Sequence, residues 1–184
     1  MSGRFPPLPR EALDDAQRAV FDAIASGPRG AVGGPFTVLL RAPAMADAVQ
    51  HLGASLRFAG LLDDRLREIA ILTVSRHWSA QYEWFAHHPI ALKAGVDAEA
   101  LGRLLQRQDP QFADVTEQLV WRISQAVLEH GRLDDSEFAM ARDTLGEARL
   151  VELLGVLGYY TLLSFILNVG QVPVPSPLPF PEAP

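Results

Sequence analysis

The sequence contains no cysteine, so it can form neither a disulfide nor a thiolate metal site. Positive charge is also in short supply, with 16 lysines and arginines against 22 aspartates and glutamates and a net charge of −6. A surface that binds nucleic acid needs an excess of positive charge, which argues against DNA or RNA as a partner. The N-terminus lacks the basic and then apolar pattern of a signal peptide, so we expect a cytoplasmic protein.

Strand patterns are missing as well. No stretch alternates apolar and polar residues with a period of two between turn signals, whereas apolar residues recur at helical spacing along most of the chain. The 184 residues are most simply one domain. We therefore predict an all-α, single-domain bundle of about six to eight helices over 1–184, with an extended leader at 1–10 and a proline-rich tail at 171–184. Whether that tail crosses to a neighbouring subunit is open.

Long uncharged runs are rare, and the longest lies in the last expected helix, 147–169. Residues 153–169 of that helix carry no charge, but a membrane span needs about 20 such residues, and this run contains Gly155, Ser164 and Asn168. We expect no membrane contact. A helix that is apolar on every side is buried on every side, so this helix predicts contact with a second copy of the chain.

Unusual polar residues gather in one stretch, 63–96, which predicts two antiparallel helices joined by a short connection. Asp63 and Asp64 start the first helix, and Ser79 is a candidate cap for the second, which ends at Gly95. Glu83 and His87 stand one turn apart on the second helix. Glu68 on the first helix is expected to face that pair across the hairpin.

A carboxylate beside an imidazole suits proton transfer, because it orients the ring, favours the protonated form and holds one tautomer. The same spacing also arises by chance on solvated helix faces. The pair alone therefore leaves both a catalytic and a surface role open.

The stretch RLREIAILTVSRHWSAQYEWFAHHPIALKAGV resembles the signature region of the carboxymuconolactone decarboxylase-like family, whose superfamily includes alkylhydroperoxidases. The segment GPFTVLLRAP, from Gly34, is similar to the approach segment of that family. The combination of the RLRE helix, the QYEW segment and the HH pair makes the resemblance specific. It implies a helical fold and a homo-oligomer, a trimer or a hexamer.

In the redox-active branch of the superfamily, a Cys-x-x-Cys pair occupies the positions of Ala80 and Glu83, while Glu68 and His87 match the residues that relay protons. Without a sulfur nucleophile, the dithiol peroxidase reaction is disfavoured. The resemblance then implies a lyase similar to carboxymuconolactone decarboxylase, with His87, Glu68 and Glu83 as catalytic residues. It would act on a small carboxylated lactone or related acid, without a cofactor or a metal.

Such a substrate is anionic and partly apolar, so its site needs a cation and aromatic surface. Tyr82, Trp84, His88 and Arg76 are the candidate substrate-binding residues. Arg67 and Arg57 are alternatives to Arg76 as the anion contact.

Two other hypotheses stand beside the lyase. A metal site could use His87, His88, Glu83 and Glu68, although adjacent histidines point about 100° apart on a helix. A non-catalytic helical oligomer could also have kept the fold without the dithiol.

Overall fold

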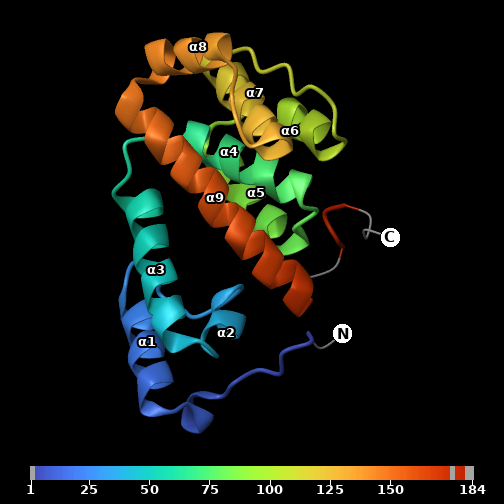
Figure 1. Cartoon of the computed structure of the whole chain (residues 1–184). Helices are drawn as coiled ribbons and strands as arrows, with labels where there is room; N and C mark the ends of the chain where they lie inside the picture. Colours follow the sequence, from blue (N-terminus) through green and yellow to red (C-terminus); the bar gives the residue numbers. More distant parts are fainter. Residues whose placement is uncertain (1–2, 175–176, 181–184) are drawn as a thin grey trace. The chain divides into compact units, whose positions relative to one another are not determined.

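The computed structural model describes residues 3–174 and 177–180, and within them regular structure is entirely helical (Figure 1). The all-α prediction is confirmed. The elements are a 3₁₀ helix η1 (Arg10–Ala12), then α1 (Asp15–Ser26), α2 (Phe36–Leu39), α3 (Pro43–Phe58), α4 (Asp64–His77), α5 (Gln81–Ala94), α6 (Ala98–Leu105), α7 (Val115–His130), α8 (Asp135–Leu145) and α9 (Glu147–Gly170).

The chain divides into two compact units. The first comprises residues 1–60 and 165–173, and the second comprises 61–164 and 174–184. The expectation of one domain for the whole chain stays a prediction.

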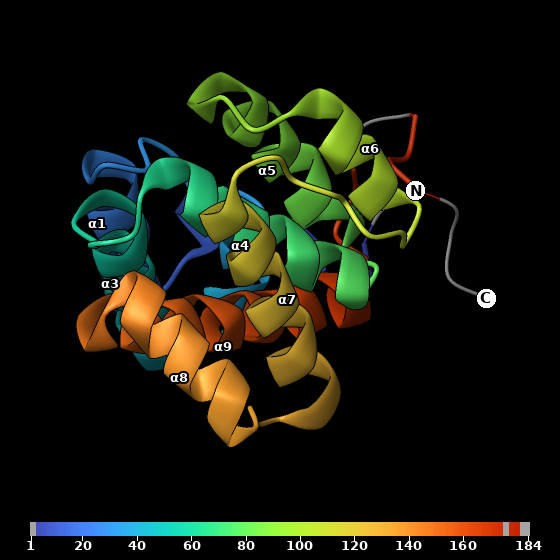
Figure 2. The ribbon, with the colours of Figure 1, turned by 90° about the horizontal axis from the view of Figure 1, so that it is seen from above.

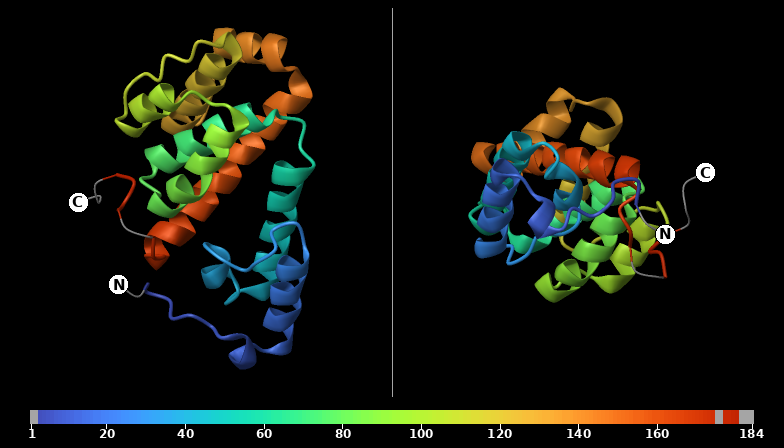
Figure 3. Two further views of the ribbon diagram at one scale, coloured as in Figure 1. Left: turned by 180° about the vertical axis from the view of Figure 1, so that it is seen from behind. Right: turned by 90° about the horizontal axis from the view of Figure 1, so that it is seen from below.

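The first unit is built on the pairing of α1 with α3, which run side by side in Figures 1 and 3. A capping box starts α1: the Asp14 side chain accepts a hydrogen bond from the Gln17 backbone N–H, and the Gln17 side chain accepts one from Asp14. Val20 and Ile24 of α1 are buried. The leader joins this unit through the Arg4 backbone N–H, which donates to the Gly170 carbonyl oxygen over 2.8 Å.

The second unit is built around α4, with α5 and α7 packed against it (Figure 2). Ten consecutive residues of α4, from Leu66 to Ser75, are buried. A helix that is covered on all sides cannot keep a polar face to water, so each polar side chain on it needs a partner inside the protein. Arg67 and Glu68 are two such residues, and they make α4 the origin of the candidate site.

Caps fix where the helices of the second unit begin and end. Asp63, Asp97, Asp114 and Asp134 each accept backbone N–H bonds at the first turn of a helix. Gly95 and Gly131 adopt left-handed φ values of 94° and 68° where α5 and α7 end. The sequence predicted these stops.

Two local predictions were wrong. Ser79 does not cap α5: it has a φ of 52°, and Ala80 occupies the N-cap position without a side-chain hydrogen bond. Apolar spacing over 112–130 also predicts a helix from 112 with Val115 facing inward, but the helix begins at Val115 itself, which is 83% exposed. Asp114 caps that helix, because its carboxylate accepts hydrogen bonds from the backbone N–H groups of Thr116 and Glu117, which have no partner within the helix.

Among the described residues, α9 is the one helix long and apolar enough to cross a membrane. Half of its most apolar 18-residue segment is buried inside the protein. Core helices of soluble proteins pass the same test. Within the second unit, Leu153, Val156 and Tyr160 are buried, whereas Val151 and Leu154 are exposed. The contact with a second subunit that the sequence suggested stays a prediction.

Helix α9 lends itself to a stability test, because Leu153 is fully buried. We expect Leu153→Ala to lower the free energy of unfolding by about 2–5 kcal/mol, from lost apolar burial and the cavity left behind. Val115→Ala, at the exposed position, serves as the control and should change it by less than about 0.5 kcal/mol. Urea unfolding followed by circular dichroism measures both, and equal effects would contradict the packing of α9.

Candidate functional site

The helices α4 and α5 form an antiparallel hairpin joined by Trp78–Ala80. The connection is short because the Ala80 backbone N–H and carbonyl both bond to Ser75: its N–H donates to the Ser75 carbonyl oxygen over 2.8 Å, and its carbonyl accepts from the Ser75 hydroxyl over 2.9 Å. This tight turn places the start of α5 against the end of α4. Residues one or two turns into α5 therefore face the middle and start of α4.

Glu68, His87 and Glu83 meet between the two helices. Nδ1 of His87 lies 2.7 Å from Oε2 of Glu68, and Nε2 lies 3.5 Å from Oε2 of Glu83. The three residues are buried, with exposed fractions of 2%, 4% and 3% for Glu68, His87 and Glu83. One imidazole thus lies between two carboxylates, and when both ring nitrogens carry a proton, one N–H points toward each.

Arg67 brings a positive charge to the same place. Its Nε lies 3.9 Å from Oε1 of Glu68 and has no hydrogen-bond partner, although the residue is only 7% exposed. Its Nη2 is 2.6 Å from the Asp64 carboxylate. A buried guanidinium N–H without a partner is costly, which marks Arg67 as a group that can still accept an anionic ligand.

Aromatic rings surround the His87 imidazole. The Tyr160 ring of α9 meets it edge to face, with the centroids 5.1 Å apart, and Tyr159 packs on Tyr160 at 5.2 Å. This apolar wall keeps water from the ring and strengthens its interaction with the two carboxylates. The sequence suggests that Tyr159 or Tyr160 reaches the site but does not decide between them, because a tyrosine in an uncharged helix gives no sign of which side chain it will touch.

Three predicted substrate-binding residues lie on α5 next to this cluster. Tyr82 is half-buried, and burial and then the Glu83 charge raise the pKa of its phenol, so the hydroxyl keeps its proton and can donate. Trp84 is buried and stacks on His88, with the ring centroids 5.9 Å apart. Trp84 also meets Phe180 of the tail edge to face at 6.0 Å.

The described part of the tail therefore packs on its own chain. Phe180 is 4% exposed, and its backbone N–H donates to the side-chain oxygen of Gln81 over 3.2 Å. The sequence left open whether this arm crosses to a neighbour. An isolated phenylalanine between prolines carries no signal for the surface it covers.

Arg76, the fourth predicted substrate-binding residue, is not part of the Glu68–His87 cluster. It follows Glu68 by eight residues, a rise of about 12 Å along the helix axis. Its Nε donates to the Leu105 carbonyl oxygen over 2.6 Å, and its guanidinium lies over the Phe180 ring at 4.9 Å. Of the three arginines considered for an anion, Arg67 is the one that contacts Glu68, while Arg57 lies in the first unit on α3.

Among the described residues, no group of three or more histidine and acidic side chains has an arrangement that could hold a metal ion. His51, a histidine of α3, is exposed and contacts Asp47 at 3.4 Å. The catalytic assignments made from the sequence stay predictions, but the structure brings Glu68, Glu83 and His87 into contact.

Comparisons with known proteins agree with this architecture. Residues 43–116, which include α4 and α5, match the model of the Carboxymuconolactone decarboxylase family. A search of the curated proteins found no match. A crystal structure described as the alkylhydroperoxidase AhpD core of an uncharacterized peroxidase-related protein from Ralstonia eutropha JMP134 is similar in fold, with a TM-score of 0.79. The two chains share 15% sequence identity, and the similarity covers 96% of this chain and 94% of the other.

The family-model match covers about two fifths of the chain, and the likeness to the solved structure shows an alkylhydroperoxidase-like fold. The resemblance read from the sequence is confirmed for residues 43–116 and for the alkylhydroperoxidase-like fold.

Burial lowers the pKa of His88, which predicts a pH dependence of stability. The unfolded chain then binds the proton more tightly than the folded protein, so stability falls as the pH drops below about 6.5 toward the lowered value. We expect His88→Gln to show a smaller loss between about pH 7.5 and about pH 5. Urea unfolding at several pH values measures this, and parallel curves for the two proteins would refute it.

Proposed function

We propose that the chain is a cofactor-free carboxy-lyase that acts on a small carboxylated lactone, with His87 as the residue that moves the proton. The observation that carries the proposal is the buried contact of Glu68 with Nδ1 of His87 at 2.7 Å, with Glu83 on the other ring nitrogen. The match to the family model over 43–116 supports the same class of reaction.

Loss of carbon dioxide from such a lactone breaks a carbon–carbon bond and leaves its electron pair conjugated with the ring carbonyl. The resulting dienolate carries charge on oxygen, and a proton must then return to carbon. His87 supplies that proton from Nε2, the nitrogen that faces Glu83. Glu68 holds the ring through Nδ1 and stabilises the imidazolium that precedes the transfer.

Glu83 takes the place of a thiol in this arrangement. It stands where the redox-active branch carries its second cysteine, and its carboxylate lies 3.5 Å from His87 Nε2. A carboxylate there exchanges protons with the imidazole but cannot reduce a peroxide. Because the whole sequence lacks cysteine, we do not propose the dithiol peroxidase reaction.

Arg67 is our candidate for the anionic part of the substrate. Its Nε has no hydrogen-bond partner and lies beside Glu68, so a substrate carboxylate could complete its hydrogen bonding. Tyr82, with its proton retained, and the Trp84 and His88 pair would complete a partly apolar wall. We further propose a homo-oligomer, a trimer or hexamer, in the cytoplasm.

The test is turnover of γ-carboxymuconolactone with carbon dioxide release followed directly. We expect His87→Ala to lower turnover by about 10²-fold or more, because it removes the proton donor. Glu68→Gln should keep a hydrogen bond to the ring but lose the charge. Its turnover should therefore lie between that of His87→Ala and that of the wild type. His51→Ala, at an exposed histidine of α3, is the control and should leave turnover unchanged.

Each outcome decides something. Circular dichroism first establishes that the variants are folded. If the wild type releases carbon dioxide and His87→Ala releases it equally fast, His87 has no part in the mechanism. No release by folded wild-type protein would overturn the lyase proposal for this substrate.

A further inference from the structure

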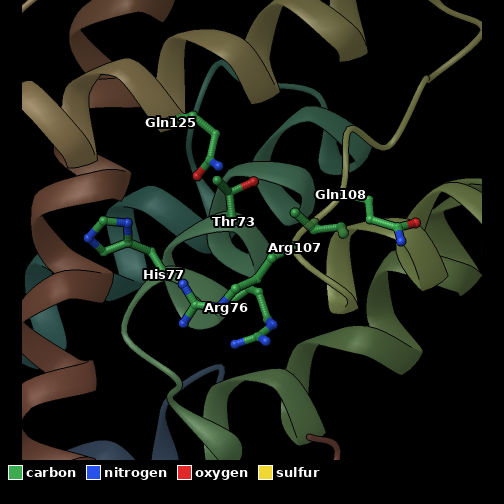
Figure 4. Close-up of a pocket in the computed structure, with 7 residues that line it drawn as sticks. Thr73, Arg76, His77, Arg107, Gln108 and Gln125 are labelled. Atoms are coloured by element: carbon green, nitrogen blue, oxygen red, sulfur yellow. The ribbon is translucent and has the colours of Figure 1, made fainter.

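A polar cavity lies near the C-terminal end of α4, away from the Glu68–His87 cluster (Figure 4). It has a volume of about 60 Å³, several times the roughly 10–15 Å³ that one water needs by the same measure. Its walls come from α4, from α6 and the loop after it, and from α7: Thr73, Arg76, His77, Leu104, Arg107, Gln108 and Gln125. None of these residues is acidic.

Two guanidinium groups face the cavity without a carboxylate between them. Arg76 and Arg107 both donate to the Ser79 hydroxyl oxygen, over 3.4 and 3.2 Å, so their charges are held close together on a neutral acceptor. The ion pairs formed by the described residues include neither of them. Two like charges held this way repel, and an anion placed between them would relieve the repulsion.

The pKa directions of the cavity residues agree with this excess of positive charge. Burial and then the Arg107 charge lower the pKa of Arg76. The pKa of His77 is lowered by burial first and by Arg107 second, and Glu129 acts in the opposite direction. Both Arg76 and His77 thus experience the positive charge of Arg107.

The backbone around the cavity is strained at two points. Ser79 and Arg107 have φ values of 52° and 60°, in the left-handed region that residues other than glycine rarely occupy. Strain of this kind persists where the surrounding structure enforces it, and it gathers at ligand sites. Of these two strained residues, Ser79 provides the hydroxyl acceptor, and Arg107 carries one of the two guanidiniums that donate to it.

The donors around the cavity suit a tetrahedral oxyanion. The two guanidiniums can each present paired N–H groups, and the Gln108 and Gln125 amides can add neutral donors. Figure 4 shows Arg76 and Arg107 near each other, Gln125 above them, and the Gln108 amide farther to the right. An oxyanion has several acceptor oxygens, and two of them can match the paired N–H groups of one guanidinium, a geometry that a single chloride ion does not offer.

We propose that this cavity is a binding site for a phosphate or sulfate group, held between Arg76 and Arg107. The site is separate from the lyase site, since Arg76 follows Glu68 by eight residues along α4. It therefore holds or fails independently of the proposed reaction.

Isothermal titration calorimetry with inorganic phosphate, at constant ionic strength set with chloride, tests the site. We expect one phosphate per chain, and an affinity roughly tenfold or more weaker in Arg107→Gln, because a charged hydrogen-bonding partner is lost. Arg107 is exposed, so this variant should fold; Arg76→Gln should behave alike. Arg132→Gln, an exposed arginine outside the cavity with the same charge change, is the control and should bind phosphate as the wild type does.

Phenyl phosphate, titrated in parallel, identifies the source of the group. Tighter binding than inorganic phosphate supports a phosphorylated metabolite, and equal binding supports the free ion. No saturable binding to the wild type, or equal binding by Arg107→Gln and Arg132→Gln, would overturn the site. Dissociation of an assembly by phosphate, seen by sedimentation and absent in Arg107→Gln, would also overturn it, because the cavity would then hold an acidic group of a second copy.

Discussion

The burial of charge on α4 is the constraint on which the second unit depends. A carboxylate taken out of water is tolerated only when a positive or hydrogen-bonding group meets it, and Glu68 meets both His87 and Arg67. His87 can reach Glu68 only because the three-residue connection Trp78–Ala80 folds α5 back along α4. The tight turn, the buried helix and the charge cluster therefore require one another.

The same helix separates two kinds of polar chemistry. Near its start, Glu68 and its neighbours form a mixed cluster in which negative and positive groups compensate. Near its end, Arg76 joins Arg107 in an arrangement with positive charge only. About 12 Å of helix rise separates Glu68 from Arg76. Phe180 of the tail contacts both Arg76 and Trp84. The tail thus packs over the surface that joins the two regions.

The fold of the hairpin depends less on particular side chains than its chemistry does. A similar fold occurs in the peroxidase-related protein from Ralstonia eutropha at 15% identity, which shows how little of the architecture depends on particular side chains. Chemistry depends on a few positions instead. In this chain Glu83 places a carboxylate oxygen 3.5 Å from Nε2 of His87.

The sequence by itself determined the helical class, most helix boundaries and the pairing of Glu68 with the Glu83 and His87 turn. These features follow from local rules: apolar spacing, aspartate caps, glycine stops and the one-turn separation of two side chains. The resemblance over 65–96 pointed to the family whose model matches 43–116. Local rules failed at Ser79, whose hydroxyl accepts hydrogen bonds from Arg76 and Arg107 and does not cap α5.

Only the tertiary structure decided which distant side chains meet. Arg67, Arg76 and Arg57 are equivalent in the sequence, yet one lies beside Glu68, one beside Arg107 and one on a helix of the other unit. Tyr160 and Phe180 reach α5 from segments far along the chain. Such contacts depend on how whole helices pack and on where a tail without periodicity lies, and neither is encoded in the spacing of neighbouring residues.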